Sequence, residues 1–314
     1  MLVGATGVGK STLINTMINY ILGVKWEDDF RFKIVDKRVE GPQSQAHSQT
    51  QVIAAYTIHS NEHHTIPYTL TIIDTPGFGD TRGIERDKAI VHQVKEFFSH
   101  PEDHHVDHLD GVGFVANSTT GRLTPTQKYI FWSILSLYGK DIEPNIIILA
   151  TFSDRGRPQV VSAFEEENIR CEGNLFKFNN SALFECNVAK GGSDSGEDDL
   201  AVPHAYWKMG MRNMKSFFKS LDQLEPVSLV LTKEVLCERL RLENTSENMH
   251  QQIQTINTKC FVDMNVEACR CTQRLQEIAL KPQMSMKEYV DILIENEKRS
   301  HVLGWEDRLS VKKG

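Results

Sequence analysis

The 314-residue sequence contains no apolar run of the ~18 residues that a membrane-spanning helix requires. Its 35 lysines and arginines are scattered and outnumbered by 42 acidic residues, which argues against nucleic acid as the main partner. The six cysteines lack the paired spacing of a zinc site, and we interpret them as reduced thiols of a cytoplasmic protein. No strict heptad persists in the C-terminal part, which favours separate helices over a long coiled coil.

The distribution of apolar residues predicts the fold class. Hydrophobic residues make up 40% of the chain, which is enough for a sizeable core. Runs of strand character alternate with runs of helical character, as a doubly wound domain requires. We therefore predict an α/β fold with a doubly wound, mostly parallel sheet over residues 1–223, followed by an α-helical extension over residues 224–314.

Individual elements can also be placed. Strands are expected near residues 51–59, 68–74, 111–117, 145–151 and 175–178. Helices are expected near residues 10–22, 84–99, 125–139, 158–169 and 204–222, and in the extension over 227–256, 265–280 and 286–298. The acidic, glycine- and serine-rich stretch 191–200 is predicted to be a disordered loop. Only three residues precede Gly4, fewer than the ~5–6 of an ordinary strand, so we expect the first strand to be truncated at the N-terminus.

The most informative motif is the octamer GATGVGKS at residues 4–11, which fits the pattern G-x-x-x-x-G-K-[ST]. Its glycines let the backbone approach an anion, so that amide groups of the loop and of the following helix point at phosphates. Lys10 would contact the β and γ phosphates, and Ser11 would supply a hydroxyl to Mg²⁺. We predict that a nucleoside triphosphate binds here, in contact with Gly4, Ala5, Thr6, Gly7, Val8, Gly9, Lys10, Ser11 and Thr12.

A second motif follows an alternating strand-like run and reads DTPGFGD over residues 74–80. Asp74, at the carboxyl end of a buried strand, could hold the magnesium ion through water. Gly77 could direct its N–H toward a γ-phosphate. This is the D-x-x-G of a GTPase, and the alternative is a plain Pro-Gly turn.

A third motif, Thr151-Phe152-Ser153-Asp154, ends an apolar run where GTPases usually carry [NT]-K-x-D. The Asp154 carboxylate could accept hydrogen bonds from guanine N1 and N2, which adenine does not offer together. Phe152 replaces the usual lysine and could cover the base only by stacking, so an ATPase stays a less favoured alternative. Asn179, Asn180 and Ser181 follow a short strand, and they either approach the base from its other side or shape a turn.

In this order the motifs resemble those of GTPases related to septins and to the immunity-associated nucleotide-binding (GIMAP) family. DTPGFGD is the more septin-like part, whereas GRLT at residues 121–124 and FNNSA at 178–182 are similar to the GIMAP and chloroplast import-receptor branch. The resemblance spans about residues 1–220. It implies a Mg²⁺-dependent GTP-binding domain that assembles through its nucleotide face.

A hydroxyl just before the second strand should complete the magnesium shell when a γ-phosphate is present, and we predict Thr50 for it, with Ser48 as the alternative. We assign catalytic roles to Lys10, Thr50 and Gly77, and metal ligation to Ser11, Thr50 and Asp74. Ras-like enzymes orient water with a glutamine where this chain has Phe78, so intrinsic hydrolysis should be slow. Arg82 and Arg86 are either charge stabilisers or solvent-facing residues.

The sequence thus predicts a Mg²⁺-dependent protein that binds GTP and GDP, hydrolyses GTP slowly, and acts as a switch or a nucleotide-regulated assembly module. Its expected partners are a second copy through the nucleotide face, or other proteins through the helical extension. The alternative is a scaffold that binds GTP without turning it over. Phosphate release by the purified protein separates the two.

Overall fold

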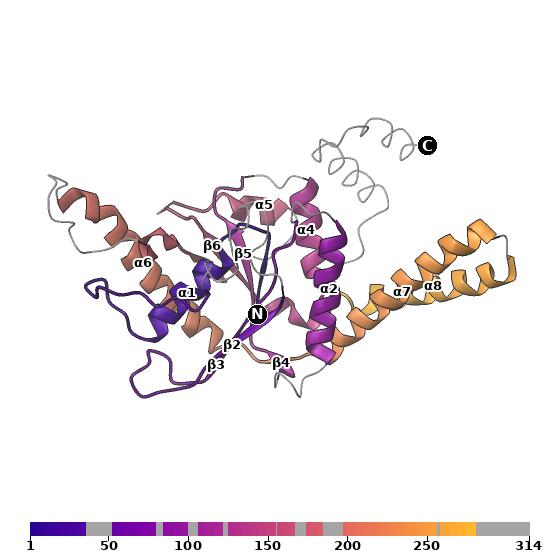
Figure 1. The fold of residues 1–314 in the computed structure, drawn as a ribbon, viewed down its shortest axis with the longest axis horizontal. Helices are drawn as coiled ribbons and strands as arrows, with labels where there is room; N and C mark the ends of the chain where they lie inside the picture. Colours follow the sequence, from indigo (N-terminus) through magenta and orange to yellow (C-terminus); the bar gives the residue numbers. More distant parts are fainter. Residues whose placement is uncertain are drawn as a thin grey trace. The chain divides into compact units, whose positions relative to one another are not determined.

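A computed structural model of the chain describes residues 1–35, 52–79, 84–99, 106–121, 125–154, 156–166, 174–184, 197–255 and 258–280 (Figure 1). These residues form two compact units. Unit 1 comprises Met1–Arg86, Asp110–Thr124 and Asn145–Glu225, and unit 2 comprises Asp87–Leu109, Pro125–Pro144 and Pro226–Gly314. The two units are defined by the contacts within each of them, and they do not test whether residues 1–223 form a separate domain. The domain boundary after residue 223 therefore stays a prediction.

Unit 1 is built on a six-stranded sheet with the strand order β2-β3-β1-β5-β6-β7. Neighbouring strands are parallel except for β2, which runs antiparallel to β3. The strands are β1 (Leu2–Gly4), β2 (Ala54–Ile58), β3 (Leu70–Asp74), β5 (Val112–Asn117), β6 (Ile146–Thr151) and β7 (Leu175–Lys177). β1 lies between β3 and β5, where the strand order reverses. In open α/β sheets ligands bind beyond the carboxyl ends of the strands at such a point. The predicted α/β class with a mostly parallel sheet is confirmed.

The sequences of the strands explain their places in the sheet. All six residues of β6, IIILAT, are buried, as expected of a parallel strand that is covered on both faces. The edge strand β2, AAYTI, instead alternates between half-buried and exposed residues. The Leu2 of β1 is in register with Asp74 of β3, so the end of β3 lies beside the centre of the sheet.

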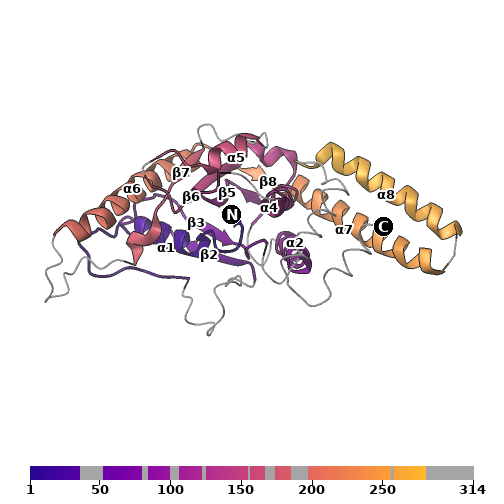
Figure 2. The ribbon, with the colours of Figure 1, turned by 90° about the horizontal axis from the view of Figure 1, so that it is seen from above.

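Helices α1 (Lys10–Ile21) and α6 (Glu197–Leu221) pack on one face of this sheet and lie side by side in both views (Figures 1 and 2). Tyr20 of α1 stacks on Phe218 of α6 with ring centroids 5.5 Å apart. A shorter helix, α5 (Val160–Glu166), places the Phe164 ring edge-on against Phe114 of β5 at 5.6 Å. The stacking of Tyr20 on Phe218 holds the C-terminal end of α1 against α6.

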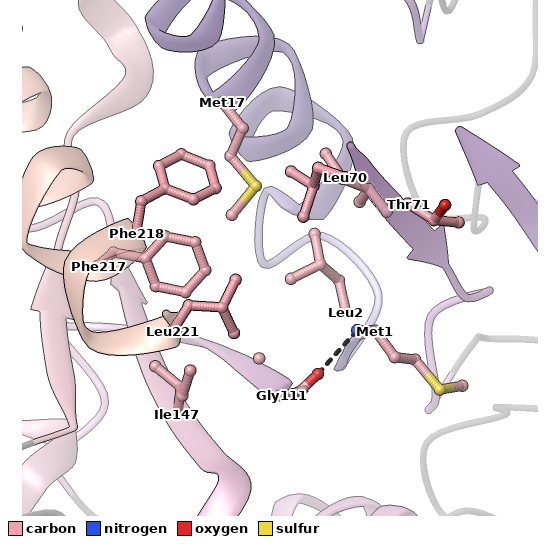
Figure 3. Close-up of a pocket in the computed structure, with 12 residues that line it drawn as sticks. Met1, Leu2, Met17, Leu70, Thr71, Gly111, Ile147, Phe217, Phe218 and Leu221 are labelled. Carbon is pink, nitrogen blue, oxygen red and sulfur yellow. Dashed lines mark hydrogen bonds between the residues drawn. The ribbon is translucent and has the colours of Figure 1, made fainter. Parts of the chain in front are cut away.

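Figure 3 shows a cavity of about 40 Å³ between α1, α6 and the sheet, with mainly apolar walls. Leu2, Leu70 and Ile147 line it, and all three lie at the amino ends of their strands. The amino group of Met1 donates a hydrogen bond to Gly111 O at 2.9 Å there, and burial lowers the pKa of this amine to about 6. The GATGVGKS loop follows the carboxyl end of β1, so this cavity lies at the opposite edge of the sheet.

Unit 2 contains most of α2 (Ile84–Ser99), α4 (Pro125–Leu135) and an antiparallel pair of helices, α7 (Val230–Thr255) and α8 (Thr258–Ile278). The pair runs side by side in Figures 1 and 2. Its core contains Val235, Leu275 and Ile278. Arg274 Nε donates to Glu234 Oε1 at 2.8 Å, which ties the two helices together at the surface. The described part of the predicted C-terminal extension is therefore largely helical, as expected.

Two sequence-based boundaries are corrected by the structure. Helix α7 begins at Val230 instead of 227, because β8 (Val227–Ser228) pairs with β4 (His108–Leu109). Helix α6 begins at Glu197, so the last four residues of the predicted disordered loop 191–200 are helical. The helix expected over 286–298 lies outside the described residues.

None of the helices in the described part of the chain has the length and apolar character needed to cross a bilayer.

Candidate functional site

The loop between β1 and α1 has the backbone geometry of an anion site. Gly7 and Gly9 have φ angles of 80° and 86°, a left-handed conformation that glycine adopts without steric cost. At Gly4, a methyl group would lie 2.4 Å from Val115 O, so only glycine fits. Gly9 caps α1 without any side-chain hydrogen bond. Because the N-cap Gly9 has no side chain, it does not satisfy the first N–H groups of the helix, and such groups at a helix N-terminus can bind an anion.

Lys10 fills the inside of this loop and is 7% exposed. Its Nζ donates to the carbonyl oxygens of Gly4 and Ala5, both at 3.0 Å. Burial lowers the pKa of Lys10 to about 8, and the nearby Asp74 carboxylate partly opposes this shift. The buried Lys10 ammonium group thus contacts only neutral carbonyl groups among these hydrogen-bond partners. A highly charged anion bound in the loop would stabilise the protonated form of Lys10.

The loop after β3 is fastened to the phosphate-binding loop. Thr6 N–H donates to Phe78 O at 2.9 Å, Phe78 N–H donates to Gly4 O at 3.2 Å, and Ala5 forms a parallel bridge with Phe78. Gly77 lies so close that a methyl group on it would be 2.6 Å from Thr6 Cα. The two motifs, 70 residues apart in the sequence, therefore form one continuous backbone surface.

Buried polar groups surround this junction. Asp74 is fully buried at the end of β3, and the Thr75 hydroxyl beside it donates to Leu2 O at 2.9 Å. Thr6 Oγ1 is buried and forms no hydrogen bond with any residue of the described ranges. A buried hydroxyl without a partner is unusual and is explained when a ligand or its water completes the site. The ring of Phe78 is fully buried, so it belongs to the core.

The third motif meets the phosphate loop through Thr151. Its hydroxyl lies 2.7 Å from Val8 O, to which it donates, and 3.1 Å from Ala116 O. Asp154, three residues later, is exposed, and its Oδ1 accepts from Gly156 N–H at 2.8 Å. The strand that carries the predicted base-reading residues is therefore anchored directly on the loop that carries the predicted phosphate contacts.

Asn179, Asn180 and Ser181 lie at the start of a short 3-10 helix, η2 (Asn180–Leu183). Asn179 Oδ1 caps this helix and accepts from Ser181 Oγ at 2.8 Å. Asn180 Oδ1 accepts from Thr16 Oγ1 of α1 at 3.1 Å. These residues therefore shape a turn, which was one of the two predicted roles. Their contact with a base stays a prediction.

The structure thus brings residues 4–12, Asp74, Gly77 and Asp154 to the carboxyl edge of one sheet. Thr50, its alternative Ser48, and Arg82 lie outside the described residues. Arg86 is half-buried at the start of α2. Sequence reasoning missed the role of the Thr151 hydroxyl, although its place at the end of an apolar strand beside a glycine loop was a signal for it.

Comparison with known proteins agrees with this geometry. Residues 1–106 match the family model described as Septin. Septin-9 of Mus musculus is 40% identical over 80 residues, which cover 26% of this chain and 12% of Septin-9. Septin-9 of Homo sapiens is also 40% identical over 80 residues, which cover 11% of its length. The chain therefore matches only a small part of these relatives.

Among solved structures, Toc33 from Arabidopsis thaliana in complex with GDP and Mg²⁺ is similar at 16% identity and a TM-score of 0.42, over 72% of this chain and 85% of Toc33. A dimerisation-deficient mutant of Toc33 has a TM-score of 0.43 with the same identity and coverage. The resemblance to the GIMAP branch stays a prediction. Residues 1–106 are therefore similar to the Septin family model, and most of them belong to unit 1, whose sheet is mostly parallel and carries the two joined loops.

Proposed function

We propose that unit 1 binds a guanine nucleotide together with Mg²⁺ at the carboxyl edge of its sheet. The observation that carries this proposal is the burial of Lys10 inside a glycine loop that is hydrogen-bonded to the loop carrying Gly77. Burial of a charged lysine inside the loop costs free energy, and interaction with phosphate oxygens would offset this cost. The buried Thr6 hydroxyl, which forms no hydrogen bond with the residues that the structure describes, supports the same proposal.

Mg²⁺ would be held by Ser11 at the first turn of α1 and, through water, by the buried Asp74. Thr50 is proposed to complete this shell when a triphosphate is bound. When present, the ion neutralises charge on the phosphate oxygens. The protein side of the site orients the phosphates through the loop amides, Lys10 and the N–H of Gly77.

The preference for guanine is proposed from Asp154, whose carboxylate is exposed beside the loop. The septin match supports this choice of base. Phe152 in place of a lysine is the feature that keeps an ATPase as a weaker alternative.

Slow hydrolysis is proposed because Phe78 follows Gly77 and turns its ring into the core. No hydrogen-bonding side chain is thus offered at the position where Ras-like enzymes hold the attacking water. A scaffold that binds GTP and does not hydrolyse it is the second candidate. Phosphate release over hours distinguishes them, since the scaffold releases none.

Equilibrium titration tests the proposal as a whole. Binding of fluorescent GDP and GTP analogues to the purified chain should be saturable, and chelation of Mg²⁺ should weaken the triphosphate more than the diphosphate. Substitution of Lys10 by alanine should remove most of the affinity for both. An affinity for GTP that is unchanged in Lys10→Ala would contradict the proposed site.

A further inference from the structure

Phe152 has a backbone conformation that a bulky residue rarely adopts. Its φ angle is 52°, and no other non-glycine residue within the described ranges has a positive φ. The residue is nevertheless 53% exposed, although phenylalanine is among the residues most often buried. The chain therefore bears a steric cost to hold an aromatic ring at its surface, and such strain is typical of functional sites.

The conformation is imposed by buried neighbours on both sides. Ser118 Oγ donates to the carbonyl of Phe152 itself at 2.9 Å, and Ser118 N–H donates to Thr151 O at 2.9 Å. On the other side, Ser153 N–H donates to Phe178 O at 3.0 Å. Thr151 and Ser153 are 2% and 1% exposed. The backbone is thus fixed before and after Phe152, and the residue between them must turn outward.

The ring lies against the phosphate loop. A methyl group placed on Gly9 would lie 3.7 Å from both Cε2 and Cζ of Phe152. Gly9 has no side chain that could cover the ring, and it immediately precedes Lys10. Asp154, the proposed reader of the base, is two residues further along the same exposed turn. One edge of the ring therefore touches the phosphate site while the rest stays open to a ligand.

We propose that Phe152 is a stacking platform for the purine base of the bound nucleotide, held in its strained conformation by Ser118, Thr151 and Ser153. The proposal rests on the proposed nucleotide site and names the residue that supplies base affinity there. Stacking on an aromatic ring uses the π-face, which every base has. Phe152 accordingly supplies affinity for purines in general, and discrimination between purines depends on Asp154.

A pair of substitutions separates the ring from the backbone. Phe152→Asn removes the ring and keeps a residue that tolerates positive φ, whereas Phe152→Tyr keeps the ring. Affinities for GTP, inosine triphosphate and inorganic tripolyphosphate would be measured with Mg²⁺ by displacement of a fluorescent GTP analogue from each variant. Phe30→Asn, which removes a phenylalanine that is 49% exposed on the segment after α1, is the matched control.

We expect Phe152→Asn to weaken GTP and inosine triphosphate equally, by roughly 5- to 150-fold, the range measured for removal of a stacking residue. Tripolyphosphate, which has no base, should bind equally well to all variants, and Phe152→Tyr should stay within about threefold of wild type for every ligand. The urea midpoint of the nucleotide-free Phe152→Asn protein should equal or exceed that of wild type, because positive φ is less strained for asparagine.

Two outcomes would contradict the proposal that Phe152 stacks on the base. Unchanged GTP affinity in Phe152→Asn would show that the ring does not touch the base. An equal loss for tripolyphosphate would show that Phe152 shapes the phosphate loop instead. A wild-type protein that binds none of the three ligands would contradict the proposed nucleotide site itself, and that result is distinct from either of these.

Discussion

The amide of Thr6 donates a hydrogen bond to the carbonyl of Phe78 at 2.9 Å, across the boundary between the phosphate loop and the loop after β3. Together with the bond from Phe78 N–H to Gly4 O, this contact joins the backbones of the two loops. A ligand that displaces one loop must break these bonds or shift the other loop with it. The nucleotide state at Lys10 would thereby be coupled to the chain that follows Gly77.

Gly77→Ala tests this junction. The added methyl group would lie 2.6 Å from Thr6 Cα and 2.8 Å from Thr6 N, which are backbone atoms that cannot rotate away. We expect a loss of about 1–3 kcal/mol in the free energy of unfolding, measured in urea, and weaker GTP binding. Gly210→Ala is the control, because nothing lies within 4 Å of its added methyl in helix α6, where alanine is favoured. A variant Gly77→Ala as stable as wild type would show that the loops are not packed together.

The pKa of Lys10 predicts how stability depends on pH without nucleotide. Its value is about 8 in the folded chain and 10.5 when unperturbed. Between these pH values the unfolded chain binds more protons than the folded one, so the free energy of unfolding rises with pH. The free energy of unfolding of wild type minus that of Lys10→Met should therefore rise by about 3 kcal/mol from pH 7.5 to pH 10.5. Lys219→Met, at an exposed lysine of α6, should follow the wild-type profile. A constant difference between wild type and Lys10→Met would mean that Lys10 is solvated.

Asp154→Asn should shift the base preference from guanine toward xanthine. The carboxylate accepts from guanine N2, whereas an amide can donate to the 2-oxygen of xanthine. Asp154 is exposed, so the fold should tolerate the change. Competition titrations with GTP and xanthosine triphosphate give the preference directly. If the variant keeps the wild-type preference for GTP, Asp154 does not read the base, and the ATPase alternative gains support.

GTP should favour dimerisation more than GDP does. The γ-phosphate would order the loops around Thr50 and Gly77, and a ligand shifts an assembly equilibrium only by its different affinities for the two states. A coupling of ~1–3 kcal/mol, or roughly 5- to 150-fold in the dimer dissociation constant, is typical. Sedimentation velocity over a micromolar concentration series, with GDP and with a non-hydrolysable GTP analogue, measures it. Identical monomer distributions in both states would point to other proteins as the partners.

The sequence predicted most of the fold because its signals there are local. The strand run 145–151 is continuously apolar, and the observed β6 starts one residue later. The glycine pattern at residues 4–11 predicted the conformation of the loop, because glycine alone adopts it freely. Helix α7 was predicted to begin three residues too early, because the pairing of Val227 and Ser228 with a strand more than 100 residues away leaves no mark in the local sequence.

The details of the site depended on tertiary contacts. The positive φ of Phe152 arises from hydrogen bonds made by Ser118 and Ser153. The residues next to Phe152 in the sequence do not predict these bonds. The bond from the Thr151 hydroxyl to Val8 O likewise joins residues 143 positions apart. Sequence motifs therefore identified the segments of the site. The hydrogen bonds that join these segments could be seen only in the structure.

The identity of the nucleotide that copurifies with the protein tests the central claim most directly. The chain would be purified in Mg²⁺ without added nucleotide, denatured, and its supernatant resolved by ion-pair chromatography, with Lys10→Ala purified in parallel. We predict GDP or GTP at close to one equivalent per wild-type chain and little in the variant. Adenine nucleotide at the same stoichiometry would contradict the assignment of guanine. Equal amounts of nucleotide in wild type and Lys10→Ala would contradict the site itself.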